Sequence, residues 1–363
     1  MSRIKIVPLV GTVGVPARYG GFETLAEQLC CQISADDVQF VVYCERHSYH
    51  ATERTENFNG HQRVFLPLKA NGVSSLFYDA LALLDAVFRR RASEIFIFGY
   101  SGAWILPLLK LVRPRINYIV NVDGMEWRRD KFSGPTKLLL KALEWCAARA
   151  ASVVIADNSA LAELFRDRYK FEPVVIAYGG DHTLVREESF CQPALVEDAA
   201  PGHYLAIARI EPENNSEMII QGCISVGAPL VFIGNWMANN YGRKLRAKYG
   251  DAPDIQLLDP IYDQTDLASW RAGAVGYIHG HSVGGTNPSL VEALFHTNQV
   301  ASFDCSFNRA TMSGTGDYFS DADSLAVLLR AGLNPIRDVD LRHLRDIYRW
   351  GTIALRYRGF IPN

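Results

Sequence analysis

The residues with the clearest chemical potential lie at 279–292, where a glycine-rich loop leads into a helix. The loop HGHSVGGTN follows an apolar run at 274–278 that predicts a short buried strand, and PSLVEAL then opens the helix. Asn287 suits the N-cap and Pro288 the first helical position. Backbone N–H groups and the positive end of the helix dipole would point at a ligand. This stretch predicts an anion-binding site, with an ordinary capped helix as the alternative.

Three side chains around this loop could contact a bound sugar or phosphate. Glu292 lies just over one turn inside the helix, where its carboxylate could accept hydrogen bonds from ligand hydroxyls. His279 and His281 flank the loop and could bond a sugar or a phosphate. A solvated glutamate and structural histidines are the alternatives, and we rank the histidines below Glu292.

Two stretches of the N-terminal half also carry chemical groups. Residues 11–21 read GTVGVPARYGG, and their glycines would let the backbone approach a phosphate or sugar closely, although an ordinary β–α turn is the alternative. This is not a GxGxxG pattern. Residues 123–128 read DGMEWR. There Trp127 could stack on an apolar sugar face while Asp123 or Glu126 bonds hydroxyls, unless the charged residues only form surface ion pairs.

The elements that would position these groups alternate between strand-like and helix-like patterns. Apolar runs at 4–10, 38–43, 94–98, 116–122 and 152–156 alternate with helical segments through residue 180. Residues 184–201 break the pattern, and the alternation restarts at 203. Short connections of this kind predict parallel sheets with helices on both faces, in which ligands bind beyond the carboxyl ends of the strands.

We therefore expect two Rossmann-like, doubly wound parallel-sheet domains of an α/β protein facing a central cleft. The predicted domains are residues 1–183 and 184–339, with an aromatic helix at about 340–363 packing back on the first domain. The 363 residues are enough for two domains.

Composition excludes several classes of protein. A formal net charge of −2 argues against a dedicated nucleic-acid binder. Seven cysteines without a CxxC pair predict reduced thiols in the cytoplasm and neither a disulfide framework nor a zinc site. No apolar run approaches the roughly 20 residues of a spanning helix, and the first residues do not form a signal peptide.

Four motifs, GTVGVPARYGGFETLAEQL, NVDGMEWRRDKF, ARIEPENN and VGGTNPSLVEAL, occur in this order. Together they resemble a GT-B glycosyltransferase of family 4, and more narrowly a bacterial rhamnosyltransferase-like subgroup acting in capsule and O-antigen assembly. The resemblance implies a retaining sugar transfer without cofactor or DxD-bound metal. It implies dTDP-rhamnose as the sugar-nucleotide donor and a saccharide or polyprenyl-diphosphate-linked saccharide as the acceptor.

The resemblance also implies roles for residues of the C-terminal half. A glutamate that binds the donor ribose corresponds to Glu292, and an arginine on the diphosphate corresponds to Arg209. The family's lysine five residues later is Asn214 here, and its glutamate eight residues before Glu292 is Gly284. Leaving-group charge would then be met by Arg209, helix N-termini and Arg18, or alternatively by a metal. The implied donor site comprises Gly20, Gly21, Arg209, Asn214, His281, Gly284, Gly285, Thr286, Asn287, Ser289, Leu290 and Glu292.

The N-terminal domain would supply the acceptor site and a catalytic face. We expect acceptor contacts from Arg18, Tyr19, Glu23, Glu126, Trp127 and Arg128. The expected catalytic residues are Asp123, Arg209 and Glu292. A general-base role for Asp123 is a hypothesis, because many family members carry a histidine near this position.

Basic and leucine-rich residues at 137–143, KLLLKAL, could lie against an anionic membrane surface, such as the inner face of the plasma membrane. A helix whose leucines face the core is the alternative. Gly284 and Asn214 depart from the residues that the family carries at these positions. A non-catalytic sugar-nucleotide-binding scaffold subunit is therefore an alternative. Within enzymes, a transferase using a UDP- or GDP-sugar and a sugar-nucleotide epimerase are further alternatives.

Overall fold

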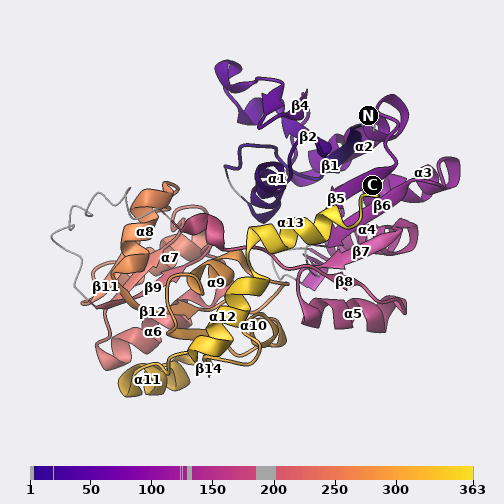
Figure 1. The fold of residues 1–363 in the computed structure, drawn as a ribbon. Helices are drawn as coiled ribbons and strands as arrows, with labels where there is room; N and C mark the ends of the chain where they lie inside the picture. The colour runs from indigo at the N-terminus through magenta and orange to yellow at the C-terminus, as the bar shows by residue number, and fades with distance from the viewer. Residues whose placement is uncertain are drawn as a thin grey trace. The chain divides into compact units, whose positions relative to one another are not determined.

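A computed structural model describes residues 4–18, 20–122, 124, 126–128, 133–184 and 202–362. The chain forms two compact units, Met1–Tyr178 with Trp350–Asn363, and Gly179–Arg349 (Figure 1). The sequence-based boundaries lay at 183 and 339. Each unit contains a sheet of parallel strands, so the alternation of strands and helices was interpreted correctly.

The first unit has an eight-stranded sheet in the order β3-β4-β2-β1-β5-β6-β7-β8. Its strands are β1 Lys5–Val10, β2 Val38–Glu45, β3 Asn57–Phe58, β4 His61–Leu66, β5 Glu94–Phe98, β6 Asn117–Val122, β7 Val153–Ala156 and β8 Val174–Val175. All neighbouring strands are parallel except β3 and β4, which form a hairpin at the edge of the sheet. The chain returns from β4 to β5 on the other side of β1, which places the topological switch point between β1 and β5.

Helices of this unit lie on both faces of the sheet. They are α1 Gly21–Gln32, α2 Ser75–Leu84, α3 Leu106–Val112, α4 Gly134–Ala150, α5 Ser159–Tyr169 and α13 Trp350–Arg358. The strand order reverses direction after β4, and right-handed crossovers then predict α1 on one face and α2, α3 and α4 on the other. The α13 helix packs against α1, and its Trp350 and Tyr357 are buried in the same core as Leu9 and Leu29.

The second unit has a six-stranded, wholly parallel sheet in the order β11-β10-β9-β12-β13-β14. Its strands are β9 His203–Ile207, β10 Leu230–Ile233, β11 Ile255–Leu258, β12 Ala274–His279, β13 Val300–Phe303 and β14 Asp317–Phe319. Its helices are α6 Ser216–Val226, α7 Asn240–Tyr249, α8 Gln264–Ala272, α9 Pro288–Ala293, α10 Ser306–Thr311, α11 Ala322–Ala331 and α12 Asp338–Ile347. Since β10 and β11 extend one way from β9 and β12 lies on the other side, the switch point lies between β9 and β12.

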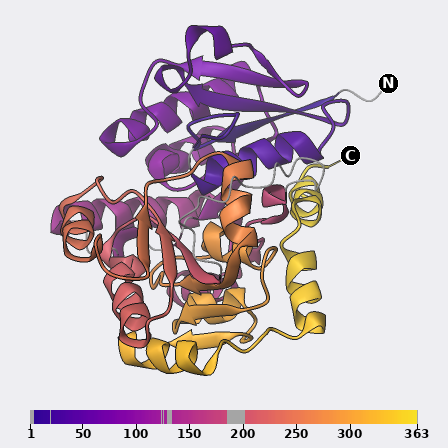
Figure 2. The ribbon, with the colours of Figure 1, turned by 90° about the vertical axis from the view of Figure 1, so that its left-hand side faces the viewer.

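The C-terminal segment differs from the single helix expected at 340–363. Two helices form, α12 in the second unit and α13 in the first; Figure 2 shows this segment in yellow. The Tyr348 hydroxyl donates to Thr311 O at 2.7 Å, which holds the end of α12 to the second unit. Trp350 packs edge-on against Tyr178 in the first unit, with ring centroids 4.9 Å apart. The chain therefore changes units between residues 349 and 350.

Two further predictions concern cysteines and membranes. The six cysteines among the described residues are free thiols. Within the described ranges, none of the helices combines the length and apolarity needed to span a bilayer.

Candidate active site

The loop after β12 has the architecture predicted for it. β12 ends at His279, and α9 begins at Pro288 with Asn287 as its N-cap. The Asn287 Oδ1 accepts hydrogen bonds from the Ser289 backbone N–H at 3.1 Å and from the Ser289 hydroxyl at 2.9 Å. The predicted N-cap is therefore confirmed.

A close approach between two loops fixes the start of this segment. Asn215 Nδ2 donates to Gly280 O at 2.8 Å, and the Ser282 N–H donates to Glu213 O at 2.9 Å. A Cβ on Gly280 would lie 2.2 Å from Asn214 O, so only glycine fits without displacing backbone. The loops that follow β9 and β12, on either side of the switch point, are thus bonded to each other.

Asn214 occupies the position for which the sequence resemblance implied a lysine. Its side chain is buried, and its Nδ2 donates to Arg209 O at 2.5 Å. Its Oδ1 lies 2.5 Å from His281 Nδ1, while His281 O accepts from Asn308 Nδ2 at 2.8 Å. The side chains of Asn214 and Asn308 therefore join three loops at the carboxyl ends of β9, β12 and β13. The polar atoms of the Asn214 amide are already used within the protein.

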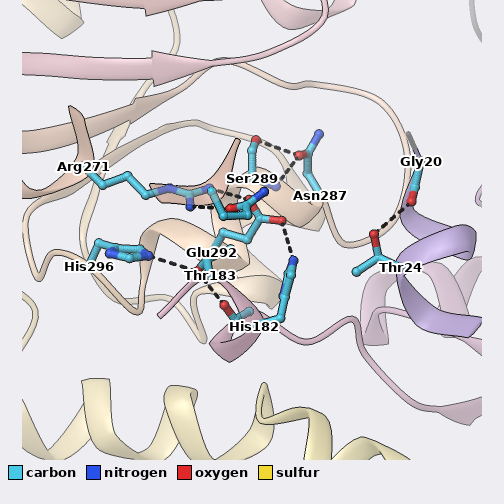
Figure 3. A network of polar contacts seen from close by, with 11 residues as sticks. Gly20, Thr24, His182, Thr183, Arg271, Asn287, Ser289, Glu292 and His296 are labelled. Atoms are coloured by element: carbon cyan, nitrogen blue, oxygen red, sulfur yellow. Dashed lines mark hydrogen bonds and ion pairs between the residues drawn. The ribbon is translucent and has the colours of Figure 1, made fainter. Parts of the chain in front are cut away.

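Glu292 on α9 is paired with Arg271, which lies in the last turn of α8 (Figure 3). Arg271 Nη2 lies 2.8 Å from Glu292 Oε2, and the two side chains are 4% and 16% exposed. Arg271 Nη1 also donates to Gln264 Oε1 at 3.3 Å. A buried, charge-assisted hydrogen bond of this kind fixes the direction of the carboxylate.

His182 lies next to Glu292, and the neighbouring Thr183 contacts His296 (Figure 3). His182 Nε2 lies 3.7 Å from Glu292 Oε1, which is beyond hydrogen-bond distance. The Thr183 hydroxyl donates to Gly180 O at 2.7 Å and lies 2.9 Å from His296 Nε2. Because the single hydroxyl proton goes to Gly180, the His296 Nε2 must carry the hydrogen in that contact.

Burial changes the proton affinity of this cluster. It raises the pKa of Glu292 to about 7, although the Arg271 guanidinium acts in the opposite direction. Burial, and then the charge of Arg271, lowers the pKa of His182 to about 4. The same two causes, in that order, lower the pKa of His296 to about 3. At neutral pH both histidines are therefore neutral, and the contact between His182 and Glu292 is not an ion pair.

Arg209 follows β9 on the carboxyl side of the sheet. Its side chain is exposed, and none of the carboxylates in the described part of the chain pairs with it. Arg209 and Glu292 thus follow β9 and β12, the two adjacent strands at the switch point. An exposed guanidinium and an oriented carboxylate at this place suit a ligand that carries both phosphates and hydroxyls.

Several predicted N-terminal site residues stabilise their own loop. Glu23 Oε1 accepts from the Val13 N–H at 2.8 Å, and a Cβ on Gly20 would lie 2.1 Å from Glu23 Oε2. Gly21 is the first residue of α1. Arg18 Nη2 lies 2.6 and 2.7 Å from the two carboxylate oxygens of Glu53. Glu23 therefore already binds the protein backbone, while Arg18 is neutralised at the surface.

The expected stacking residue Trp127 is enclosed by charged side chains. Its Nε1 donates to the fully buried Glu144 at 2.7 Å. Lys141 Nζ and the Arg168 guanidinium lie 4.5 and 4.8 Å from the Trp127 ring centre, and the Arg128 guanidinium lies 5.4 Å away. These cations already occupy positions over the ring that a sugar would need. Asp123, Tyr19 and the side chain of Glu126 lie outside the described residues.

Sequence analysis missed four residues of the Glu292 cluster, which are Arg271, His182, Thr183 and His296. Arg271 belongs to the helix before β12, and only burial distinguishes it from an ordinary surface arginine in that pattern. Across the parts of the chain that the structure describes, no group of three or more His, Cys, Asp or Glu side chains could hold a metal ion.

Comparisons with known proteins address the family and the fold. Residues 4–181 match the family described as "Domain of unknown function (DUF1972)". Comparison with curated proteins finds no significant sequence match.

Solved structures resemble the chain over almost its whole length. Sucrose-phosphate synthase from Thermosynechococcus elongatus has a TM-score of 0.78 at 14% identity, covering 99% of this chain and 98% of that one. Anabaena HepE in complex with UDP has a TM-score of 0.72 at 13% identity, covering 99% of both chains. An alpha,alpha-trehalose-phosphate synthase (UDP-forming) from Burkholderia xenovorans, in complex with glucose-6-phosphate, has a TM-score of 0.72 at 9% identity, covering 98% of this chain and 99% of its own. These likenesses confirm the predicted GT-B fold.

Proposed function

We propose that the protein is a glycosyltransferase that moves a sugar from a nucleoside diphosphate to a hydroxyl group of an acceptor. The observation that carries this proposal is the placement of Arg209 and Glu292 after the two strands that flank the switch point of the second unit. The GT-B fold supports the proposal, because proteins whose names denote sugar transfer share it.

In the proposed reaction the bond between the anomeric carbon and the diphosphate oxygen breaks, and the acceptor oxygen forms a new bond to that carbon. The nucleoside diphosphate departs with the bonding electrons, and the proton of the acceptor hydroxyl passes to the departing diphosphate. Arg209 would meet the negative charge that grows on the leaving diphosphate. Glu292 would accept hydrogen bonds from the ribose hydroxyls, with Arg271 and His182 setting its orientation and charge.

Finer features of the proposal depend on the motif resemblance. We propose L-rhamnose from dTDP-rhamnose as the donor, a retaining transfer without cofactor or bound metal, and a saccharide or lipid-linked saccharide acceptor of capsule or O-antigen assembly. A UDP-sugar is the second candidate donor, because HepE has been crystallised with UDP and with UDP and glucose. Transfer that persists in excess EDTA would support the metal-free reaction.

A thermal-shift comparison with dTDP, UDP, GDP and ADP tests the donor site. A ligand present at about 100 times its Kd stabilises the native state by about 2.7 kcal/mol, so binding raises the unfolding midpoint. We expect a shift with dTDP that Glu292→Gln abolishes and that Glu163→Gln, a change at an exposed position of α5, leaves intact. A shift with UDP alone would identify a UDP-sugar as the donor in place of dTDP-rhamnose. The absence of a shift with any of the four nucleotides would contradict the donor site.

Incubation with the sugar nucleotide then separates the alternatives. A transferase releases free nucleotide slowly without an acceptor and rapidly with one. An epimerase changes the sugar of the intact donor without an acceptor, which proton NMR detects. A scaffold subunit binds the donor and changes nothing.

A further inference from the structure

The outward face of α2 carries apolar side chains where a surface helix normally carries polar ones. Phe77, Leu81, Leu84 and Phe88 are exposed, and their spacing of four, three and four residues places them on one stripe. The last of them lies in the π-helical turn η4, Asp85–Arg89, which continues α2. The opposite side of α2 packs into the protein through buried residues such as Leu83. A helix that is apolar on both sides needs a second apolar environment.

A second apolar stripe lies beside the first. The short helix η5, Ser101–Ile105, continues into α3, and Trp104, Leu108 and Leu111 are exposed at a spacing of four and three residues. Leu111 is 79% exposed.

Contacts at both ends hold the two stripes together. Trp104 Nε1 donates to Leu76 O at 3.0 Å. The Arg113 guanidinium lies 5.4 Å from the centre of the Phe88 ring. The four residues of the first stripe and the three of the second therefore form one surface, here called the α2–α3 face. It belongs entirely to the first unit.

The margin of the α2–α3 face is positively charged. Arg89, Arg91, Arg113 and Arg115 are all exposed. The only acidic residues at 72–116 are Asp79, Asp85 and Glu94. Asp79 and Glu94 are buried, and Asp85 is bound by Arg90 at 3.0 Å. Over this fully described stretch, exposed cations therefore accompany the apolar surface without any exposed carboxylate.

We propose that the α2–α3 face docks the protein onto an anionic lipid bilayer. Leucine and phenylalanine side chains would enter the boundary between headgroups and acyl chains, and the arginines would contact lipid phosphates. Trp104 would lie at the interface, where its ring and N–H group are both accommodated. Apolar surface rimmed by polar residues marks an interaction site in soluble proteins.

Charge favours a membrane over a second copy of the chain. In a two-fold symmetric dimer the same patch covers itself, so two surfaces of net positive charge would be brought together. A bilayer rich in acidic lipids instead supplies the opposite charge. Leu138 and Leu139, within the stretch 137–143 of α4, are exposed as well, and α4 packs against α3. Those two leucines do not face the core.

Vesicle sedimentation of the full chain tests this proposal without involving sugar transfer. We expect binding to vesicles of equal phosphatidylcholine and phosphatidylglycerol, weaker binding in high salt and no binding to pure phosphatidylcholine. Leu108→Glu with Leu111→Glu should lower the bound fraction at least about ten-fold, since two charges replace two inserting side chains. The matched control, Val327→Glu with Leu355→Glu, changes exposed apolar residues of α11 and α13 and should bind like the wild type.

A second variant, Arg91→Gln with Arg115→Gln, alters only exposed charge and should also weaken binding to the acidic vesicles. Unchanged unfolding midpoints establish that the variants are folded. Failure of the wild type to sediment, or equal binding by wild type and both variants, would overturn the proposal. A dimer in light scattering that Leu108→Glu with Leu111→Glu dissociates would assign the face to self-association instead. Nucleotide binding that persists in the non-sedimenting variants would leave the donor site intact.

Discussion

Arg271 Nη2 lies 2.8 Å from Glu292 Oε2, and this pair joins the helix before β12 to the helix after it. The carboxylate is therefore oriented by the protein before any ligand arrives. Preorganisation of this kind lowers the ordering cost of binding. Burial and the Arg271 guanidinium together set the pKa of Glu292. Because the charge of Glu292 follows from that pKa, the pair also makes ligand affinity depend on pH.

Nucleotide binding and folding should respond to pH in opposite directions. Burial raises the pKa of Glu292 to about 7 from the usual 4.5, so the native state holds more protons than the unfolded state between these values. The free energy of unfolding should fall by about 3 kcal/mol in total as pH rises through that window. Affinity for a nucleoside diphosphate should rise over the same window, because the ionised carboxylate is the better acceptor for ribose hydroxyls.

Urea unfolding and calorimetric titration at about pH 5 and pH 8 measure the two effects. His182 and His296 also titrate, since burial lowers the pKa of each below the usual 6.5. Their contribution has the opposite sign, because stability is lost as pH falls below 6.5 and they take up protons only on unfolding. The difference between wild type and Glu292→Gln isolates the glutamate. An equal pH dependence in the two proteins would contradict the assignment.

Arg271→Met should move the pH profile of nucleotide binding to higher pH. The Arg271 guanidinium is the group that lowers the pKa of Glu292, so its removal leaves only burial, which raises that pKa. At pH 7 the variant should bind a nucleoside diphosphate roughly five-fold more weakly, because a pKa about one unit higher lowers the ionised fraction of Glu292 from about one half to about one tenth.

Arg271→Lys keeps the charge and should restore part of the shift, since a lysine replaces the fork of the guanidinium with a single ammonium group. A merely structural role would lower affinity equally at every pH. That outcome in calorimetric titrations across the pH range would show that Arg271 does not act through the ionisation of Glu292.

Gly280→Ala should destabilise the second unit and reduce donor binding together. The new methyl group would lie 2.2 Å from Asn214 O, which belongs to backbone and must move. A cost of about 1–3 kcal/mol in urea unfolding is expected, the range for overpacking. Gly134→Ala is the matched control, because a Cβ there meets no atom within 4 Å. Wild-type stability of Gly280→Ala would show that the loops after β9 and β12 separate readily.

Arg209→Gln should lower the rate of sugar transfer more than it lowers donor affinity. Charge on the diphosphate grows in the transition state, so an exposed arginine facing it contributes mainly there. The loss in kcat should be about 100-fold, the scale of removing one preorganised donor. Arg330→Gln on α11 provides a control at an exposed position. Equal losses in kcat and in affinity would show that Arg209 stabilises the bound donor and the transition state to the same extent.

The fold followed from the sequence wherever the pattern was local and repetitive. Apolar runs of strand length separated by helical segments predicted both parallel sheets, and Asn287 followed by Pro288 predicted the start of α9. The pair Asn59-Gly60 is a further local signal of the same kind. Asn59 and Gly60 both have positive φ, and Asn-Gly between two strands is typical of the hairpin that β3 and β4 form.

The contacts within the site depend on residues that are distant in the sequence. Glu292 pairs with Arg271 across β12, and Trp127 donates to Glu144 from a different helical element. Neither partner can be identified by spacing, because each depends on how helices pack on a sheet. Burial decides the role of Asn214 in the same way. A surface position could have carried the lysine expected there, whereas this position is enclosed and suits a neutral amide.

The return of the chain at Trp350 has a consequence for biosynthesis. Trp350, Ile353 and Tyr357 belong to the core formed around β1 and α1, so the first unit lacks part of its interior until residues 350–361 have been translated. Domains generally fold as units during synthesis, in order from the N-terminus. Here the second unit is complete on the nascent chain before the first can close. A fragment ending at residue 181, the limit of the matched family, would leave that core without α13.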